Sequence, residues 1–219
     1  MGSTEGTFGE ARRFVLLALL VYVIDRIVVS LIFIYDGHVP VLKRIPAIPF
    51  TGFVFSWILP ILITYCIEKR DARYLGLAVP REKFRVYAIY ALIGLILPAF
   101  LVRINGSLVV DFIEQIVYIG VAEEIFSRGY LMTRFCDWLG NRKGLVLNAF
   151  IFGFSHIISG MSQHGFDYLF RDAMTGVQTF FGGLLLGFVY LRSRNIVPGS
   201  IFHVSTNVYI PRLLELMSK

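Results

Sequence analysis

The sequence predicts an all-α protein built as a polytopic bundle of about seven or eight transmembrane helices. Of its 219 residues, 56% are hydrophobic and only 16% are charged. Soluble domains carry about 25% charged residues, so this composition excludes an ordinary soluble fold. The apolar residues also gather in long runs, and a helix needs a run of about 20 apolar residues to cross a bilayer.

Seven apolar runs are candidates for membrane-spanning helices, with approximate bounds 14–35, 48–67, 86–102, 108–135, 145–159, 173–191 and 198–217. The first run starts after basic residues but has no small-residue cleavage site behind it, so we expect a retained first helix rather than a signal peptide. The fourth run is longer than one crossing requires and is expected to kink or split. The fifth run is short and is expected to extend past these limits.

Basic residues cluster in the short connections between these runs, which is the positive-inside pattern of membrane proteins. This pattern accounts for the formal net charge of +6, so we expect no nucleic-acid partner. With seven crossings, the N-terminus and three basic connections fall on one side, which we predict to be cytoplasmic; His38 and His164 fall in loops on the other. The basic residues are Arg12 and Arg13; Lys69, Arg70, Arg73, Arg81, Lys83 and Arg85; Arg134, Arg142 and Lys143; and Arg192 and Arg194.

The chain has no low-complexity segment, internal repeat or Pro/Ser-rich linker that would separate soluble domains. We therefore expect one integral-membrane domain over residues 1–219. The only sizeable soluble connection is 68–85, in which Pro80 is followed by Arg81, Glu82 and Lys83. This order predicts the start of a helix at the membrane interface.

Two adjacent glutamates, Glu123 and Glu124, interrupt the fourth apolar run, and Arg128 follows one helical turn later. A charge in the middle of a membrane costs about 2.5–3.5 kcal/mol on insertion scales, so these residues need a partner or a cavity. On a helix, Glu124 and Arg128 share one face at i,i+4 spacing and suit an ion pair. Glu123 points about 100° away and stays free to face a cavity. The structural alternative is a water-exposed kink that merely holds both carboxylates.

Two histidines lie inside later apolar runs. His156 follows Phe152 by four residues, and His203 precedes Asn207 by four, which puts an imidazole and a carboxamide on one helix face. Taken singly, such residues are often packing residues or hydrogen-bonding links between helices. Their occurrence together, downstream of the two glutamates, indicates that they converge on one site.

In order along the chain, these three motifs resemble those of the CPBP intramembrane proteases, a family of glutamic endopeptidases. That family contains the type II CAAX prenyl endopeptidases and bacterial relatives tied to bacteriocin processing or self-immunity. The likeness spans 121–207, whereas the first three apolar runs match only in being apolar. The residues that match are Glu123, Glu124 and Arg128; Phe152 and His156; and His203 and Asn207.

The resemblance implies an intramembrane endopeptidase that hydrolyses a peptide bond near the cytoplasmic membrane face and uses no cofactor. Its partners would be the lipid bilayer and a peptide or C-terminal protein tail, with or without a lipid attached. It also implies an integral protein of a prokaryotic plasma membrane. We expect the catalytic motifs to lie within 121–207 and to bind no catalytic metal.

Peptide hydrolysis needs a base that takes a proton from water and donors that stabilise the oxyanion. Glu123 is the candidate base, and His156 would hold the water. His203 and Asn207 would donate to the oxyanion. The supporting residues would be Glu124 and Arg128. At 1.5 Å per residue, His156 lies about 18 Å from the cytoplasmic end of its run, whereas His203 lies about 8 Å from the end of its own run. The two histidines can reach one site if the last helix starts below the membrane surface, for instance at Pro198.

Three other classes of protein remain open. Glu123, His156 and His203 could form a zinc site of one carboxylate and two histidines, although the sequence lacks an HExxH helix. The same groups could line a proton or ion path in a transporter or channel. A bacteriocin-immunity protein could keep the fold as a binding protein without turnover. Chelator sensitivity separates the first class from a glutamic protease, and cleavage of a candidate peptide separates the other two.

Overall fold

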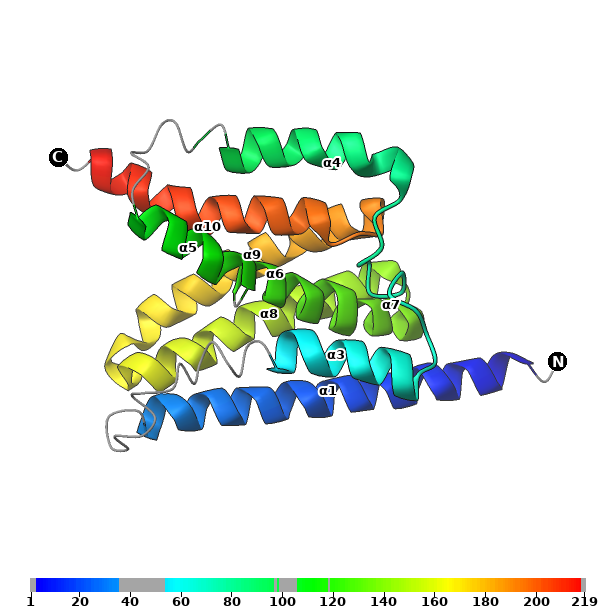
Figure 1. Ribbon diagram of the computed structural model, residues 1–219. Helices are drawn as coiled ribbons and strands as arrows, with labels where there is room; N and C mark the ends of the chain where they lie inside the picture. Colours follow the sequence, from blue (N-terminus) through cyan, green and yellow to red (C-terminus); the bar gives the residue numbers. More distant parts are fainter. Residues whose placement is uncertain (1–2, 36–53, 97, 99–105, 118, 218–219) are drawn as a thin grey trace.

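The computed structural model describes residues 3–35, 54–96, 98, 106–117 and 119–217. All regular structure in these ranges is helical, which confirms the predicted all-α class. Most helices lie roughly side by side in Figure 1, and α8 and α9 cross the others obliquely. His38, the beginning of the second apolar run and the end of the third run lie outside the described residues.

The long helices are α1 (Ser3–Tyr35), α8 (Asn141–His164), α9 (Leu169–Ser193) and α10 (Val197–Met217). Helix α3 (Leu59–Leu62) continues on both sides as π-type turns, Val54–Ile58 and Ile63–Ile67. Helix α4 (Phe84–Ala91) follows the 3-10 turn Arg81–Lys83, where the sequence predicts a helix start, and runs on as the π-type turn Leu92–Ile96. The remaining elements are α5 (Gly106–Val117), α6 (Gly120–Glu124), the π-type segment Ile125–Met132, α7 (Thr133–Leu139) and the 3-10 turn Phe166–Tyr168.

The fourth and fifth apolar runs behave as their lengths predict. The fourth run is split, because α5 ends at Val117 and α6 begins at Gly120. The fifth run extends at both ends to Asn141–His164. Within the described ranges, Asn141–His164 and Phe166–Ser193 are the two helices long and apolar enough to cross a membrane by length and composition. The full set of seven crossings stays a prediction.

The outward faces of the helices are apolar. Exposed side chains on α1 include Leu16, Leu20, Ile27 and Leu31, and those on α9 include Val177, Phe181, Leu185 and Phe188. Soluble monomers rarely expose contiguous apolar surfaces of this extent. Apolar faces of this kind fit contact with lipid tails.

Helices α8 and α9 approach each other closely because glycines face each other between them. A Cβ atom built on Gly153 would lie 2.5 Å from the carbonyl oxygen of Gly176, and one on Gly176 would lie 2.3 Å from a side-chain carbon of Ile157. Small residues of this kind let helix backbones approach in membrane proteins. This contact holds the helix that carries His156 against α9.

The three basic connections meet at one end of the bundle. Arg70 Nη1 lies 3.0 Å from Asp137 Oδ2, which joins the first connection to α7. Lys83 Nζ lies 3.4 Å from the carbonyl oxygen of Ser193, which joins the first connection to the third. Arg194 Nη2 lies 3.5 Å from Asn141 Oδ1, which joins the third connection to the second. These contacts bring the three connections to one end of the bundle, and the side of the membrane that this end faces remains a prediction.

Two sequence predictions about charged and polar positions are wrong. Arg134 does not lie in a basic loop but inside α7, with its side chain fully buried. Its guanidinium donates to both carboxylate oxygens of Glu68, at 2.8 and 2.7 Å, and lies 3.8 Å from the centroid of the Tyr130 ring. His164 is not a loop residue either, because α8 continues to that position. Its Nδ1 lies 3.4 Å from Asp172 Oδ1.

Candidate active site

The two glutamates sit at the end of α6, the short helix that follows the break in the fourth apolar run. Adjacent positions on a helix point in different directions. The side chain of Glu124 is only 1% exposed, whereas that of Glu123 is 34% exposed. The structure therefore places the two carboxylates in different environments, as the sequence predicts.

Glu124 forms the predicted ion pair with Arg128. Arg128 Nη1 lies 3.1 Å from Glu124 Oε1, and the arginine side chain is completely buried. The guanidinium carbon lies 4.2 Å above the centroid of the Phe152 ring, a cation–π arrangement. Arg128 thus joins the helix of the glutamates to α8.

His203 on α10 lies between the two carboxylates. Its Nδ1 lies 3.0 Å from Glu124 Oε1 and forms a hydrogen bond with it. Its Nε2 lies 3.7 Å from Glu123 Oε2. The bond to Glu124 holds the ring in orientation, as a carboxylate does for a catalytic histidine in many sites. The other ring nitrogen is thereby directed toward Glu123.

Gly199 permits this close approach of α10 to the glutamates. A Cβ atom on Gly199 would lie 2.8 Å from Glu124 Oε2, closer than real Cβ contacts. A side chain at this position would push Glu124 or α10 away. The distance between His203 and Glu124 therefore depends on this glycine, to which the sequence motifs did not point.

His156 reaches the same region from α8. Its Nδ1 lies 2.9 Å from the carbonyl oxygen of Phe152, one helical turn earlier. Since a carbonyl only accepts, Nδ1 carries the proton and Nε2 is the free acceptor in the neutral ring. The Phe152 ring contacts both imidazoles, with centroids 4.8 Å from His156 and 6.3 Å from His203. Phe152 thus links the two histidines.

Asn207 lies one helical turn beyond His203 on α10 and is exposed. Its Nδ2 donates to Gln115 Oε1 at 2.9 Å. Direct contacts join Glu123 and Glu124 to His203 and Arg128 to Glu124, and His156 is linked to them through Phe152. Asn207 is placed on the same helix but contacts α5 rather than the glutamates.

The depth of His203 follows from where α10 starts. The Ile196 backbone N–H donates to the carbonyl oxygen of Gly76 at 3.1 Å, and Asn195 Nδ2 donates to that of Ala78 at 2.9 Å. The connection between α3 and α4 therefore covers the beginning of α10, as Figure 1 shows at the end of the bundle where α4 begins. Helix α10 begins at Val197, next to Pro198, where the sequence predicts its start, and the equal depth of His203 and His156 stays a prediction.

Sequence reasoning missed a charged pair on α1, Asp25 and Arg26. Arg26 Nε donates to Asp25 Oδ2 at 2.8 Å, and Arg26 Nη1 donates to Ser159 Oγ on α8 at 3.3 Å. Both charges interact electrostatically with Glu123. Two adjacent charges inside an apolar run indicate a functional position. The sequence does not connect them to the site, because α1 lies far from the motifs along the chain.

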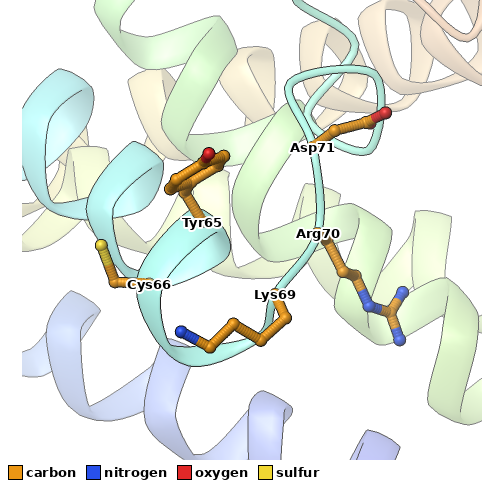
Figure 2. A pocket seen from close by; sticks show the side chains of 5 residues that line it. All are labelled: Tyr65, Cys66, Lys69, Arg70 and Asp71. Carbon is orange, nitrogen blue, oxygen red and sulfur yellow. The ribbon is translucent and has the colours of Figure 1, made fainter.

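A separate pocket of about 380 Å³ lies where the helix ending at Ile67 turns into the first basic connection. Figure 2 shows its lining residues, which are Tyr65, Cys66, Lys69, Arg70 and Asp71. Beside it, burial and a hydrogen bond to Asp137 raise the pKa of the Tyr74 hydroxyl. No motif residue lines this pocket, so it is distinct from the candidate active site.

Among the described residues, no three His, Cys, Asp or Glu side chains gather in a group that could hold a metal ion. The chemical groups that do gather are two carboxylates, two imidazoles and a buried guanidinium. Such a set can accept a proton, orient a water molecule and stabilise a developing negative charge.

The fold and the site together define an all-helical protein with lipid-compatible outer faces and a Glu/His cluster inside. Residues 105–209, just under half of the chain, match the family model described as Type II CAAX prenyl endopeptidase Rce1-like. This match confirms the resemblance drawn from the three motifs, and the segment is similar to that family of membrane-embedded proteases. A search of curated proteins and a search of solved structures found no match.

Proposed function

We propose that the protein is a glutamate-dependent intramembrane endopeptidase in which Glu123 is the general base. The observation that carries the proposal is the unequal environment of the two glutamates. Glu124 is buried and engaged by Arg128 and His203, whereas Glu123 keeps a third of its side chain exposed. A base has to reach water, and of these two carboxylates Glu123 is the accessible one.

In the proposed reaction, Glu123 takes a proton from a water molecule, and the resulting hydroxide attacks the carbonyl carbon of the substrate. His156 supports this step, because its Nδ1 is occupied by the Phe152 carbonyl and its free Nε2 can accept a hydrogen bond from the water. The carbon–nitrogen bond then breaks, and Glu123 returns the proton to the leaving amine.

Stabilisation of the oxyanion falls to α10. With a proton on each ring nitrogen, His203 donates one to Glu124 and directs the other toward the region of Glu123. Asn207, one turn along, has a second N–H beyond the one that it donates to Gln115. In this step negative charge moves from Glu123 to the oxyanion, and the net charge of the cluster is unchanged. Hydrogen-bond donors that are already in place can stabilise the oxyanion.

The proposed substrate is a peptide or C-terminal protein tail, prenylated or not, that enters from the cytoplasmic side. The N-terminal turns of α10, which lead to His203, lie under the connection at the basic end of the bundle. The positive-inside pattern favours the cytoplasmic side for that end and for the N-terminus. We place the protein in a prokaryotic plasma membrane, as one integral domain over residues 1–219 with its catalytic motifs within 121–207.

Two histidines on the same helix provide the test. Purified protein in lipid vesicles is given a panel of fluorescence-quenched peptides with prenylated tails, unprenylated tails and leader sequences, and products are identified by mass spectrometry. His156→Gln should remove nearly all turnover, and His164→Gln should leave it unchanged because His164 lies at the far end of α8. Turnover by His156→Gln at the wild-type rate would contradict the mechanism. A folded wild-type protein that cleaves no peptide of the panel would favour the transport or binding alternatives.

A further inference from the structure

The carboxamide of Asn207 is held by a residue that no motif contains. Gln115 lies in the last turn of α5, which ends at Val117. Its Oε1 accepts a hydrogen bond from Asn207 Nδ2 at 2.9 Å. These residues are 92 positions apart in the chain, so the contact is purely tertiary.

An exposed asparagine needs such a partner to act as a directed donor. Rotation about the terminal bond of an asparagine side chain has a broad energy profile, so an unbound carboxamide samples many orientations. A hydrogen bond to one N–H fixes the plane of the amide and with it the direction of the other N–H. An oxyanion donor is effective only when its direction is set before the charge develops.

The end of α5 is itself held rigidly at this place. Gly120 begins α6, and a Cβ atom on it would lie 3.2 Å from Gln115 Oε1 and 3.0 Å from Val204 Cγ2 on α10. Trp57 Nε1 donates to the carbonyl oxygen of Val117 at 2.9 Å. The last turn of α5, the first turn of α6 and α10 therefore meet at a corner with no spare room.

This corner also bears the proposed base. Glu123 lies one turn after Gly120, and its backbone N–H donates to the carbonyl oxygen of Ile119 at 2.7 Å. Gln115, on α5, therefore packs against the first residue of the helix that carries Glu123 and is hydrogen-bonded to the helix that carries Asn207. A change in the Gln115 contact alters the position of the amide relative to the base.

We infer that Gln115 is a positioning residue that orients the Asn207 carboxamide toward the oxyanion. This inference rests on the proposed function, because it assumes that Asn207 acts in the transition state. Gln115 itself touches neither the substrate nor the reacting atoms. Its effect is expected in kcat, since a directed donor acts mainly in the transition state, and not in KM.

The test compares two replacements of Gln115 that differ in one property. Gln115→Met has a similar length but cannot accept the hydrogen bond, and we expect it to lower kcat by up to about 10²-fold. Gln115→Glu keeps an acceptor oxygen for Asn207 Nδ2 and should retain most of the wild-type kcat. Glu114→Gln, an exposed neighbour on α5, is the matched control and should be unchanged. The substrate is the panel peptide that the wild-type protein cleaves fastest.

A second measurement reports the contact without any activity. Melting temperatures are measured for Gln115→Met, Asn207→Ala and the double variant, and the two effects should be less than additive because both remove the same hydrogen bond. Additive effects would overturn the positioning role of Gln115. So would a wild-type kcat in Gln115→Met if kcat is lowered in Asn207→Ala. Neither result would contradict the proposed function. Wild-type kcat in Asn207→Ala would instead remove Asn207 from the proposed mechanism. An equal loss in Gln115→Glu and Gln115→Met would show that the acceptor oxygen is not what matters.

Discussion

The adjacent glutamates allow one substitution to be tested in two environments. Glu123→Gln and Glu124→Gln make the same chemical change one residue apart. Glu124 contacts Arg128 Nη1 at 3.1 Å and His203 Nδ1 at 3.0 Å, and only 1% of its side chain is exposed. Glu123 Oε2 lies 3.7 Å from His203 Nε2, and 34% of its side chain is exposed. We expect Glu123→Gln to remove turnover. We expect Glu124→Gln to lower the melting temperature as well.

The size of the stability effect follows from the burial of Arg128. Removing one partner of a buried ion pair costs about 3–5 kcal/mol, because the other charge is left uncompensated. For a chain of this length, about 2–4 °C of melting temperature corresponds to each kcal/mol, so Glu124→Gln should lower it by roughly 6–20 °C. Glu123→Gln leaves no buried charge and should change the melting temperature by only about 2 °C. Its turnover should fall by about 10²–10⁴-fold, the usual contribution of a general base.

Thermal melting by intrinsic fluorescence and kcat per folded molecule are measured on the same preparations. The double variant Glu124→Gln/Arg128→Met provides the control, and it should melt above Glu124→Gln because the stranded cation is gone. Equal melting temperatures for the two single variants would refute the assignment of Glu124 as the structural partner. Near-normal turnover by Glu123→Gln would refute its role as the base.

Three further predictions address the donor, the topology and the metal. Asn207→Ala should reduce kcat by about 10²–10³-fold with little change in KM, and preserved turnover per folded molecule with a lower melting temperature would indicate a packing role instead. Cysteines introduced at Arg73 and His164 should be labelled from opposite sides of the membrane, and labelling of both from one side would defeat the seven-crossing arrangement. Chelator treatment should leave activity intact, whereas stoichiometric zinc, with activity lost to chelator and restored by zinc, would favour the metalloprotease alternative.

Local features of the site could be predicted because helix geometry fixes short distances. The i,i+4 spacing of Glu124 and Arg128 brings the two side chains together on any helix, and the structure shows the pair although Ile125–Met132 is of π type. The different exposure of Glu123 follows from the same geometry. The break in the fourth run followed from its excess length, since one crossing needs only about 20 residues.

Positions that depend on distant partners could not be predicted in the same way. Arg134 looks like a loop residue near the end of an apolar run, but Glu68, 66 positions away, supplies two carboxylate contacts that permit its burial. His164 looks like a loop residue as well, yet α8 continues to that position. Composition shows where charges occur along a chain, and it does not show which of them find a partner in space.

The sequence alone therefore determined the helical class, the spacing of the chemical groups and the similarity of the segment 105–209 to one protease family. Only the tertiary structure decided which groups meet. His203 lies between two carboxylates because Gly199 lets α10 approach Glu124. Glu124 precedes His203 by 79 residues in the chain. Gln115 reaches Asn207 because α5 ends at a tightly packed corner with α6 and α10. The physical reason is that spacing along one helix fixes local distances, whereas contacts between helices depend on how closely their surfaces pack.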